Sequence, residues 1–516
     1  MQGTPAMPNP GACGPLTGLT VALLGEDGVL SQAGRLLTSL GARLSRRASD
    51  ASSALALGDR ESGAPPMPMV WTERRSTAAT WALSGAMALT GRSDGPPLSE
   101  GSGAALAARG AALAFQALAA HAGLTVDISD RMFLSERAAL LGLGRNAPWS
   151  CAGSSTFVRC SDGLVVATLA RPVDVELLPA LVESDPKSGD SWTVLADWAR
   201  TRPAAEIVAR ASMLGLAMAS VPGSGRPRSR VGPGPSHVMD RDQGRAAPWV
   251  LRRGGADGRR SRRLHWSAPL VVDLSALWAG PLCSHLLGLA GARVVKVESV
   301  GRPDGARYGM RGFFDLLHAG HESVALDFAD PADRSALLRL LHRADVIIDS
   351  ARPRAMEQLG IDVNEVVSAS EGRCWIGISA YGRNGAARNR IGFGDDVAAG
   401  AGLIAWDPGD GRPAFCGDAI ADPLTGLHAA LVALACVLSG GSFVVDVPLR
   451  AAADLARMLG RSRPGRTDAA ERGRGAWVLA GEPDVRVVDG AAPAVRGAAP
   501  ELGAHTGAVL AELARR

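Results

Sequence analysis

The sequence contains few lysines, few aromatic side chains and no closely spaced pair of cysteines. Lys187 and Lys296 are the two lysines among 516 residues, so arginine carries almost all of the positive charge. The formal net charge of +4 is small for this length and gives no argument for a nucleic-acid partner. Aromatic residues make up 4% of the chain and hydrophobic residues 47%, so aliphatic side chains must fill the cores.

The seven cysteines are odd in number and scattered, which indicates neither a disulfide framework nor a zinc site and fits a reducing compartment. Histidines show no metal-ligand spacing, and the closest pair, His318 and His321, is predicted to lie in a surface turn. The first residues lack the basic and apolar segments of a secretory signal, and no uninterrupted apolar run is long enough to span a membrane. We therefore expect a cytoplasmic protein with no metal and no membrane partner.

Motifs for dinucleotide binding and for hydrolysis are missing as well. Gly392-Phe393-Gly394 supplies two glycines of a phosphate-binding loop, but it lacks the third and does not join a strand to a helix. Neither a GxSxG nucleophile elbow nor an HExxH zinc motif occurs. We expect no nicotinamide or flavin cofactor.

The first half of the chain predicts two units and a linker, within the two to four domains that the length suggests. Residues 16–125 open with a β-α-β pattern (strand 19–24, helix 32–40, return at 42–44), then a loop over 48–70 and helices over 83–91 and 103–120. Residues 126–221 predict a small α+β domain, with a hairpin turning at Ser161-Asp162 and helices over 192–201 and 204–214. Residues 222–267 are rich in Arg, Gly and Pro. Such a basic run could hold nucleic acid or anionic lipid, but interleaved aromatics are nearly absent, which favours a solvated linker.

Residues 268–460 alternate between apolar strands and amphipathic helices, which is typical of a doubly wound, mainly parallel α/β sheet. Ligands of such sheets bind beyond the carboxyl ends of the strands. The expected strands are 270–274, 293–297, 324–328, 346–349, 375–379 and 443–447, and the clearest helices are 282–289, 334–341 and 451–459.

Two segments of the first half are echoed in the second. Residues 31–44 align with 279–294 through a helix and a Gly-Ala-Arg turn, and residues 84–97 align with 400–413. Because both echoes keep the same order, they indicate a degenerate internal duplication. Chance similarity between Ala/Gly/Leu-rich segments is the alternative.

Asp422 and Pro423 precede the apolar run 427–438 and predict a helix that begins there. Asp422 is expected at the N-cap and Pro423 at the first helical position, where its missing N–H is not needed. A carboxylate at this place is either a structural cap or a reactive group beside the positive end of the helix dipole. The local pattern favours the cap.

A series of ordered motifs resembles the family III CoA-transferases, which include formyl-CoA and carnitine CoA-transferases and α-methylacyl-CoA racemase. The opening of that family is similar to Val271–Ser275, Ala279–Pro281 and Gly291–Glu298, and its catalytic aspartate motif falls on Ala421-Asp422-Pro423-Leu424-Thr425-Gly426. Further matches in family order are Ser323–Asp327, Ala344–Ile348, Arg352-Pro353, Leu359-Gly360, Ile378–Gly382 and, near the end, Pro500–Thr506.

The resemblance implies a CoA-transferase that moves CoA from an acyl-CoA thioester to a small carboxylic acid. Asp422 would be the nucleophile and would carry CoA as an aspartyl-CoA intermediate. It also implies that residues 268–460 form the catalytic large domain and that 461–516 return to that domain. Residues 16–125 and 126–221 would then be the shortened large domain and the small domain of a second, incomplete copy. The implied contacts with CoA are Leu277, Trp278, Ser299, Leu326, Ser350, Ala351 and Arg352.

Departures from the family pattern keep other interpretations open. Ser350-Ala351 replace an Asn-Phe pair, Gln358 replaces a basic residue, and His318–Glu322 replace a basic stretch, so arginines at 302, 307, 352 and 354 would have to hold the CoA phosphates. A catalytically inactive CoA-binding or scaffolding relative is the alternative function. Racemase chemistry is disfavoured because Asp395 stands where the racemase has its histidine. The family forms interlocked dimers, so we expect a homodimer or an intramolecular pseudo-dimer of the two copies.

Overall fold

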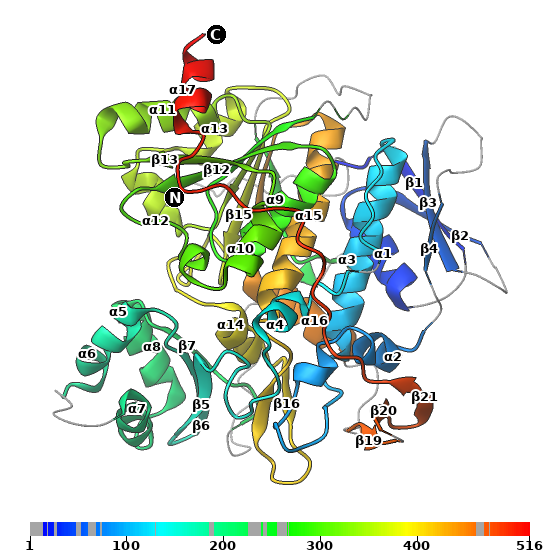
Figure 1. Cartoon of the computed structure of the whole chain (residues 1–516), viewed down its shortest axis with the longest axis vertical. Coiled ribbons are helices and arrows are strands. Elements are labelled where there is room, and N and C mark those ends of the chain that lie inside the picture. Colours follow the sequence, from blue (N-terminus) through cyan, green and yellow to red (C-terminus); the bar gives the residue numbers. More distant parts are fainter. Residues whose placement is uncertain are drawn as a thin grey trace, which may run out of the picture.

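The computed structural model describes residues 14–17, 19–24, 28–47, 53–59, 69–72, 75–129, 131–184, 190–224, 239–240, 245–254, 266, 268–460, 469–473 and 475–515. Within them, a large α/β unit from the second half of the chain packs against a smaller α/β unit from the first (Figure 1). A third unit, α5–α8 with β5–β7, projects from the lower left of that view. Lys187 and most of the Arg-rich segment 222–267 lie outside the described residues.

The central sheet has seven strands, and six of them are parallel. Its order is β10 (Val250–Arg253), β18 (Phe443–Pro448), β15 (Cys374–Ser379), β14 (Val346–Asp349), β11 (Leu270–Asp273), β12 (Arg293–Ser299) and β13 (Glu322–Leu326), with β10 antiparallel at the edge. Taken in chain order, the parallel strands have the doubly wound order 3-2-1-4-5-6, whose switch point lies between β11 and β14. This confirms the mainly parallel α/β sheet that the sequence predicts.

Both faces of this sheet are covered, as the near-continuous Val/Ile content of its strands requires. Val272, Ile347 and Trp375 pack on one face with α11 (Pro331–Leu341), α12 (Pro353–Gln358), α13 (Val363–Ser368) and α17 (Thr506–Ala514). Val271, Ile348 and Ile376 pack on the other face with α9 (Ala279–Leu289), α10 (Arg311–His318), α15 (Ala421–Ser439) and α16 (Leu449–Gly460). Along the chain, β15 and α15 are separated by α14 (Gly394–Ala401) and by a hairpin of β16 (Ile404–Trp406) and β17 (Pro413–Phe415).

The first half of the chain forms a four-stranded sheet of order β2-β1-β3-β4. Strand β1 (Leu19–Leu24), helix α1 (Gly28–Ser39) and strand β2 (Arg43–Arg47) make the predicted parallel β-α-β unit. The loop predicted over 48–70 is wrong in part, because β3 (Ser53–Asp59) pairs antiparallel with β1 and with β4 (Met69–Thr72). Small and polar residues suggested a loop there, but pairing with β1 overrides that local preference.

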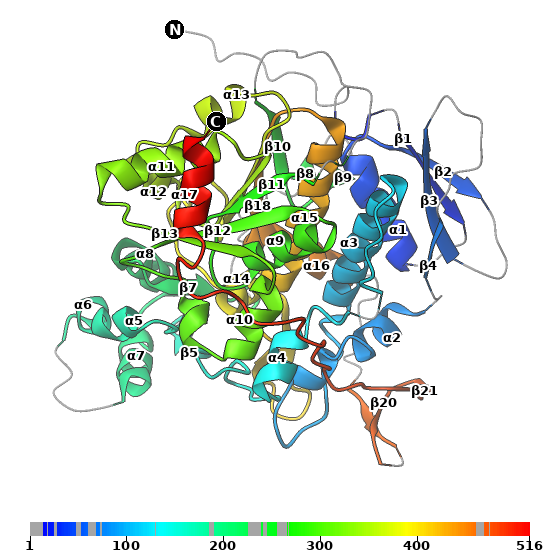
Figure 2. The ribbon, with the colours of Figure 1, turned by 45° about the horizontal axis from the view of Figure 1, so that its top comes forward.

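Helix α3 (Ser102–His121) joins the two halves. It packs against α1 on one side and against α15 and α16 on the other (Figures 1 and 2). Gly103 allows its close approach to α16, since a Cβ there would collide with the Ala456 carbonyl oxygen. The helix predicted over 83–91 is wrong: α2 (Thr77–Ala82) precedes it, and only a 3-10 turn, η1 (Met87–Leu89), falls within it.

Helices α3 and α15 are long and apolar enough, by length and composition, to cross a membrane. In the structure 83% and 89% of their apolar windows are buried, as in the core helices of a folded domain. The helix that contains the apolar run 427–438 is longer than that run, because it begins at Ala421.

Residues 155–220 form a sheet with a core of its own. The predicted hairpin is confirmed by β5 (Ser155–Cys160) and β6 (Gly163–Thr168), which β7 (Ala217–Ser220) extends. The predicted helices are confirmed by α7 (Ser191–Ala199) and α8 (Ala204–Leu214), which pack with α5 (Pro172–Glu176) and α6 (Leu178–Val182). Ahead of this unit lies α4 (Glu136–Leu141), which packs against α10.

Two segments for which no strand was predicted contribute strands. Within the predicted linker, β10 pairs with β18, and β8 (Met239–Asp240) pairs with β9 (Arg245–Ala246). Near the end, β19 (Glu471–Arg472), β20 (Trp477–Leu479) and β21 (Glu482–Arg486) form a small sheet. From there the chain (red in Figure 1) crosses to α17. Just before α17, the backbone N–H of His505 donates to the Ser323 carbonyl of β13, and the Ser323 N–H donates to His505 Nδ1 at 3.0 Å.

Candidate active site

Asp422 lies in the first turn of α15 but does not cap it. Ile420 is the residue before the first helical position, so Asp422 is second and Pro423 third; the predicted N-cap placement is wrong by two residues. The helix starts early because the Asp422 N–H donates to the Ala419 carbonyl at 2.9 Å, which continues the turn backwards. The Asp422 carboxylate instead lies beside Gly394, at the start of α14, whose backbone N–H favours the ionised carboxylate. It thus lies between the N-terminal ends of two helices.

Three other aspartates surround this position. Asp395 and Asp396 lie in the first turn of α14, and Asp418 precedes α15; all three are buried. Asp395 accepts the N–H of Ala419 at 3.0 Å, and Asp396 accepts the N–H of Phe393 at 2.7 Å. The charge of Asp418 is balanced by Arg137 of α4, whose Nε donates to Asp418 Oδ2 at 2.8 Å.

Burial raises the pKa of three of these carboxyls towards neutrality. The pKa of Asp422 rises to about 7, mainly through burial and against the charge of Arg137. Burial, helped by the charge of Asp418, raises the pKa of Asp395 to about 6, and burial raises that of Asp396 to about 8. Asp422 is the one of the four that keeps part of its surface accessible, even though protein atoms enclose it on most sides. A partly accessible carboxyl that titrates near pH 7 is suited to covalent or acid–base work.

The residues predicted to contact CoA lie at the carboxyl edge of the central sheet. Leu277 and Trp278 follow β11, and Ser350, Ala351 and Arg352 follow β14, so these five flank the switch point. Ser350 Oγ accepts the N–H of Ala276 at 3.1 Å and ties the two loops together. Ser299 ends β12 and Leu326 ends β13, farther along the same edge; the Leu326 side chain is buried in the core.

Leu277 adopts an unusual conformation at this edge. Its φ is +70°, a region that L-residues rarely occupy, and its side chain is 43% exposed. The loop is held by Asp304, whose Oδ1 accepts the N–H of Leu277 at 3.0 Å. Strained, exposed apolar residues of this kind are concentrated at ligand-binding sites.

Three arginines meet beside the switch point without acidic partners. Among the described residues, Arg302, Arg352 and Arg354 form no ion pair, and burial together with the charges of Arg354 and Arg302 lowers the pKa of Arg352. Arg307, the fourth arginine expected to hold phosphates, is instead paired with Glu298, with 2.6 Å between Nη2 and Oε2. The unbalanced positive charge favours an anion at this edge.

Trp278 connects this edge to Asp418. The Arg137 guanidinium lies over the Trp278 ring at 5.2 Å from its centre, and Phe313 of α10 packs edge-on against the same ring at 5.4 Å. Arg137 comes from outside the predicted catalytic domain, and its pairing with Asp418 joins residues 281 positions apart. Periodicity and local motifs do not reveal a contact between residues so far apart. The one local signal is Asp418 itself, an acidic residue four positions before Asp422.

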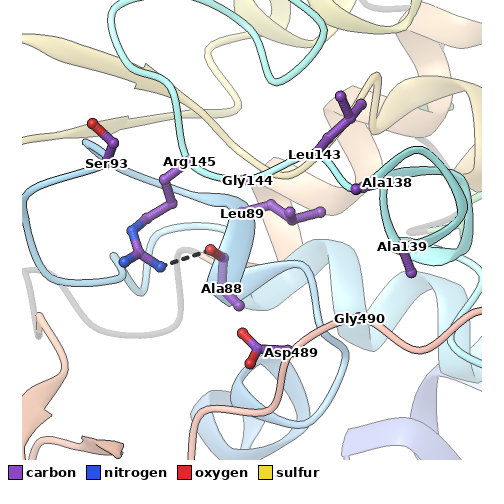
Figure 3. A pocket seen from close by; sticks show the side chains of 11 residues that line it. Ala88, Leu89, Ser93, Ala138, Ala139, Leu143, Gly144, Arg145, Asp489 and Gly490 are labelled. Atoms are coloured by element: carbon purple, nitrogen blue, oxygen red, sulfur yellow. Dashed lines mark hydrogen bonds between the residues drawn. The ribbon is translucent and has the colours of Figure 1, made fainter.

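A separate cavity of about 480 Å³ is lined in part by Ala138 and Ala139 of α4 (Figure 3). Arg145 reaches its wall and donates to the carbonyl oxygens of Ala88 at 2.8 Å and Arg92 at 3.0 Å, and Asp489 enters from the C-terminal segment. None of the residues predicted for CoA or acyl transfer lines it.

The histidine prediction is corrected by the structure. His318 and His321 are 1% and 7% exposed, and burial lowers the pKa of His321 to about 3, so the pair is a neutral core contact and not a surface turn. Throughout the described residues, no group of three or more His, Cys, Asp or Glu side chains is placed to hold a metal ion.

Comparison with known proteins finds similarity within one stretch of the chain. Residues 269–447 match the model of CoA-transferase family III. An acyl-CoA transferase of Fusarium pseudograminearum is 31% identical over 180 residues, which cover 31% of this chain and 40% of that protein. The succinyl-CoA–D-citramalate CoA-transferase of Chloroflexus aurantiacus is 31% identical over 190 residues, covering 34% of this chain and 47% of that protein.

The chain therefore spans less than half the length of these curated relatives. Among solved structures, the crystal structure of Rv3272 from M. tuberculosis is 30% identical, with a TM-score of 0.35 over 39% of this chain and 56% of that one. The matched stretch 269–447 includes β11–β18, the arginines at the sheet edge and Asp422.

Proposed function

We propose that the protein transfers CoA from an acyl-CoA thioester to a carboxylic acid through an aspartyl-CoA intermediate on Asp422. The observation that carries this proposal is the placement of Asp422 within the matched stretch: a partly accessible carboxyl, titrating near neutrality, between two helix N-termini. A structural cap would bond its own helix. Asp422 does not, so its carboxylate is available to a substrate.

The transfer consists of two half-reactions, one with the acyl-CoA donor and one with the acceptor acid, and each needs two nucleophilic substitutions. An Asp422 carboxylate oxygen attacks the thioester carbon, the C–S bond breaks, and an acyl-aspartyl anhydride and CoA thiolate result. The thiolate then attacks the aspartyl carbonyl, which forms aspartyl-CoA and releases the first acid as its carboxylate. An acceptor carboxylate repeats the two steps in reverse, so Asp422 is regenerated and no proton is consumed.

The surroundings of Asp422 fit these steps. The N–H of Gly394 and the positive ends of α14 and α15 stabilise negative charge on its oxygens, both before attack and in the tetrahedral intermediates. Because its pKa is about 7, roughly half of the molecules carry the nucleophile ionised at pH 7. Arg302, Arg352 and Arg354 would hold the CoA phosphates, and the exposed side chain of Leu277 would contact the rest of CoA. Trp278 is 4% exposed, so it would support Leu277 rather than contact CoA itself.

The remaining assignments are part of the same proposal. The donors would be acyl-CoA thioesters and the acceptors small carboxylic acids, as the name of the succinyl-CoA–D-citramalate CoA-transferase indicates for that relative. Helix α3 packs against α15, and each has a further helix beside it: α1 beside α3 and α9 beside α15. This arrangement supports a duplicated chain that folds as an intramolecular pseudo-dimer. A homodimer is the alternative. A cytoplasmic location is proposed from the sequence alone.

Trapping with hydroxylamine tests the proposal. Purified protein is incubated with acetyl-, succinyl- and formyl-CoA in the presence of hydroxylamine, and the peptide containing Asp422 is analysed by mass spectrometry for a hydroxamate. Wild type is expected to form it, and Asp422→Asn is expected to form none and to lose CoA transfer. Asp362→Asn, at the true N-cap of α13, is the matched control and should behave as wild type.

The alternative is a CoA-binding relative that has lost catalysis. The buried His318 and His321, in place of a basic stretch, favour it because the hold on CoA is weaker there. If CoA raises the melting temperature but no acyl-CoA yields a hydroxamate at Asp422, the transferase proposal is refuted and the binding function stands.

A further inference from the structure

Arg137 reaches the proposed active site from the other half of the chain. It belongs to α4, outside the stretch 269–447, and its side chain is 22% exposed. Two of its nitrogens bond the two oxygens of Asp418, which is fully buried. A planar guanidinium that meets a carboxylate in this bidentate way fixes both position and orientation.

The turn that Asp418 begins is strained. Ala419, the next residue, has a φ of +42°, a conformation that costs an alanine about 1 kcal/mol or more. Contacts from elsewhere hold it: Asp395 accepts the Ala419 N–H, and the Gly417 N–H donates to Thr90 Oγ1 at 2.9 Å. Because the Asp422 N–H bonds the Ala419 carbonyl, this turn sets where α15 begins and where the Asp422 carboxylate points.

The same guanidinium also touches the opposite side of the site. Its face lies over Trp278, the residue after the strained Leu277 at the sheet edge. Arg137 thus contacts both the turn that carries Asp422 and the loop proposed to contact CoA.

We propose that Arg137 is a positioning residue: it fixes the Asp418 turn and lends positive charge to ionised Asp422, so the first half of the chain completes the transfer site. The proposal rests on the proposed function of Asp422. It gives the first half of the chain a role in the chemistry proposed for Asp422.

The charges around Asp422 determine what loss of Arg137 does. Arg137 on α4 favours the ionised carboxylate, whereas Asp395 on α14 and Asp418 in the turn oppose it, and Cys151 lies within reach of the same charges. Arg137 acts on the pKa of Asp422 more strongly than Asp418 does. Neutralising Arg137 and Asp418 together therefore raises the pKa of Asp422 without leaving the Asp418 carboxylate buried beside a neutral partner.

The decisive variant is Arg137→Gln with Asp418→Asn, in which two neutral side chains can still hydrogen-bond. The midpoint of the pH dependence of hydroxamate formation at Asp422 is expected to move up by about one unit, while KM for the acyl-CoA changes less than about threefold. Arg137→Lys keeps the charge and loses the bidentate geometry, so it should keep the wild-type midpoint and lower kcat. An unchanged midpoint in the folded double variant overturns the proposal.

A second measurement makes the outcome independent of activity. The difference in unfolding free energy between Asp422→Asn and its parent, followed in urea from pH 5 to 8.5, reports the ionisation of Asp422 in each background. The titration should move up by about one unit in the double variant even if no acyl-CoA reacts. The matched control is Arg131→Gln with Glu136→Gln, a bidentate pair in the same segment, with Arg131 Nη2 donating to Glu136 Oε2 at 2.7 Å. A shift of equal size in this control would also overturn the proposal.

Discussion

Lys296 and Asp304 form an ion pair in the interior, with 2.9 Å between Nζ and Oδ2 and side-chain exposures of 2% and 0%. Lys296 Nζ also donates to the carbonyl of Ser275 at 2.9 Å. The other oxygen of Asp304 accepts the N–H groups of Leu277 and Ala306. One buried pair thus fixes the loop after β11 on two sides, including the positive φ of Leu277.

Replacing Lys296 by Met should therefore damage both stability and CoA binding. Asp304 would be left buried without its cation, a change that costs about 3–5 kcal/mol in comparable pairs. Urea unfolding measures the loss, and the thermal shift produced by CoA measures the effect on the loop. Lys296→Met with Asp304→Asn removes both charges and keeps an oxygen for the Leu277 N–H, so it should recover much of the stability. A single variant as stable as wild type would contradict this role.

Asp396 should make the protein less stable as the pH rises. Its pKa is about 8 in the folded state against 3.8 as the ordinary value, so the folded protein binds this proton more tightly than the unfolded chain. The free energy of unfolding then falls as the pH increases from about 4 to about 8. Asp396→Asn, which keeps an oxygen for the Phe393 N–H, should be more stable than wild type at pH 8 by about 5 kcal/mol and equal to it near pH 4. Asp330→Asn, at the exposed N-cap of α11, should show no such difference.

The arginines at the sheet edge should control the affinity for CoA. Arg352→Ala is expected to weaken CoA binding about tenfold or more, because a charge-assisted bond to phosphate is lost. The weakening should shrink as salt is raised from 50 to 500 mM, since the interaction is screened. Isothermal titration with CoA measures it, and Arg200→Ala, at the exposed C-terminal end of α7, is the control. Equal affinity of Arg352→Ala and wild type at low salt would place the phosphates elsewhere.

The central sheet could be predicted from sequence because its signal is local. Strands β11, β14 and β18 are runs of apolar, mostly β-branched residues, and each lies within one residue of its predicted range. Strand β13 was displaced by two residues, because the apolar pattern continues past its end at Leu326. Strands β3 and β10 were missed since their pairing partners, not their own residues, make them strands.

Only the part of the candidate site that has a local sequence signal could be predicted. Asp422 and the loops after β11 and β14 follow from motifs within one stretch of chain. Arg137 contributes through a contact across 281 positions, which no periodicity records. The N-cap error at Asp422 arose because Pro423 is equally compatible with the third helical position, where its missing N–H is also not needed.

Gly394 should be intolerant of any side chain, because α14 and α15 meet at this residue. A Cβ there would collide with the Ala419 carbonyl oxygen and would lie 2.5 Å from Asp422 Oδ2. Gly394→Ala must therefore push α14 away from the Asp418–Asp422 turn, and the Asp422 carboxylate would lose the Gly394 N–H. We expect a loss of about 1–3 kcal/mol in unfolding free energy and a fall in hydroxamate formation at Asp422 of at least tenfold.

The matched control is Gly507→Ala in the first turn of α17, where a Cβ meets no atom within 4 Å. There the substitution only restricts the unfolded chain and favours the helix, so stability should stay equal or rise by up to about 1 kcal/mol. If Gly394→Ala folded with wild-type stability and still formed the hydroxamate at the wild-type rate, the contact between α14 and Asp422 would not matter for the chemistry. The glycine would then be needed only for packing elsewhere, and the Gly394 N–H would have to be removed from the set of groups that stabilise the nucleophile.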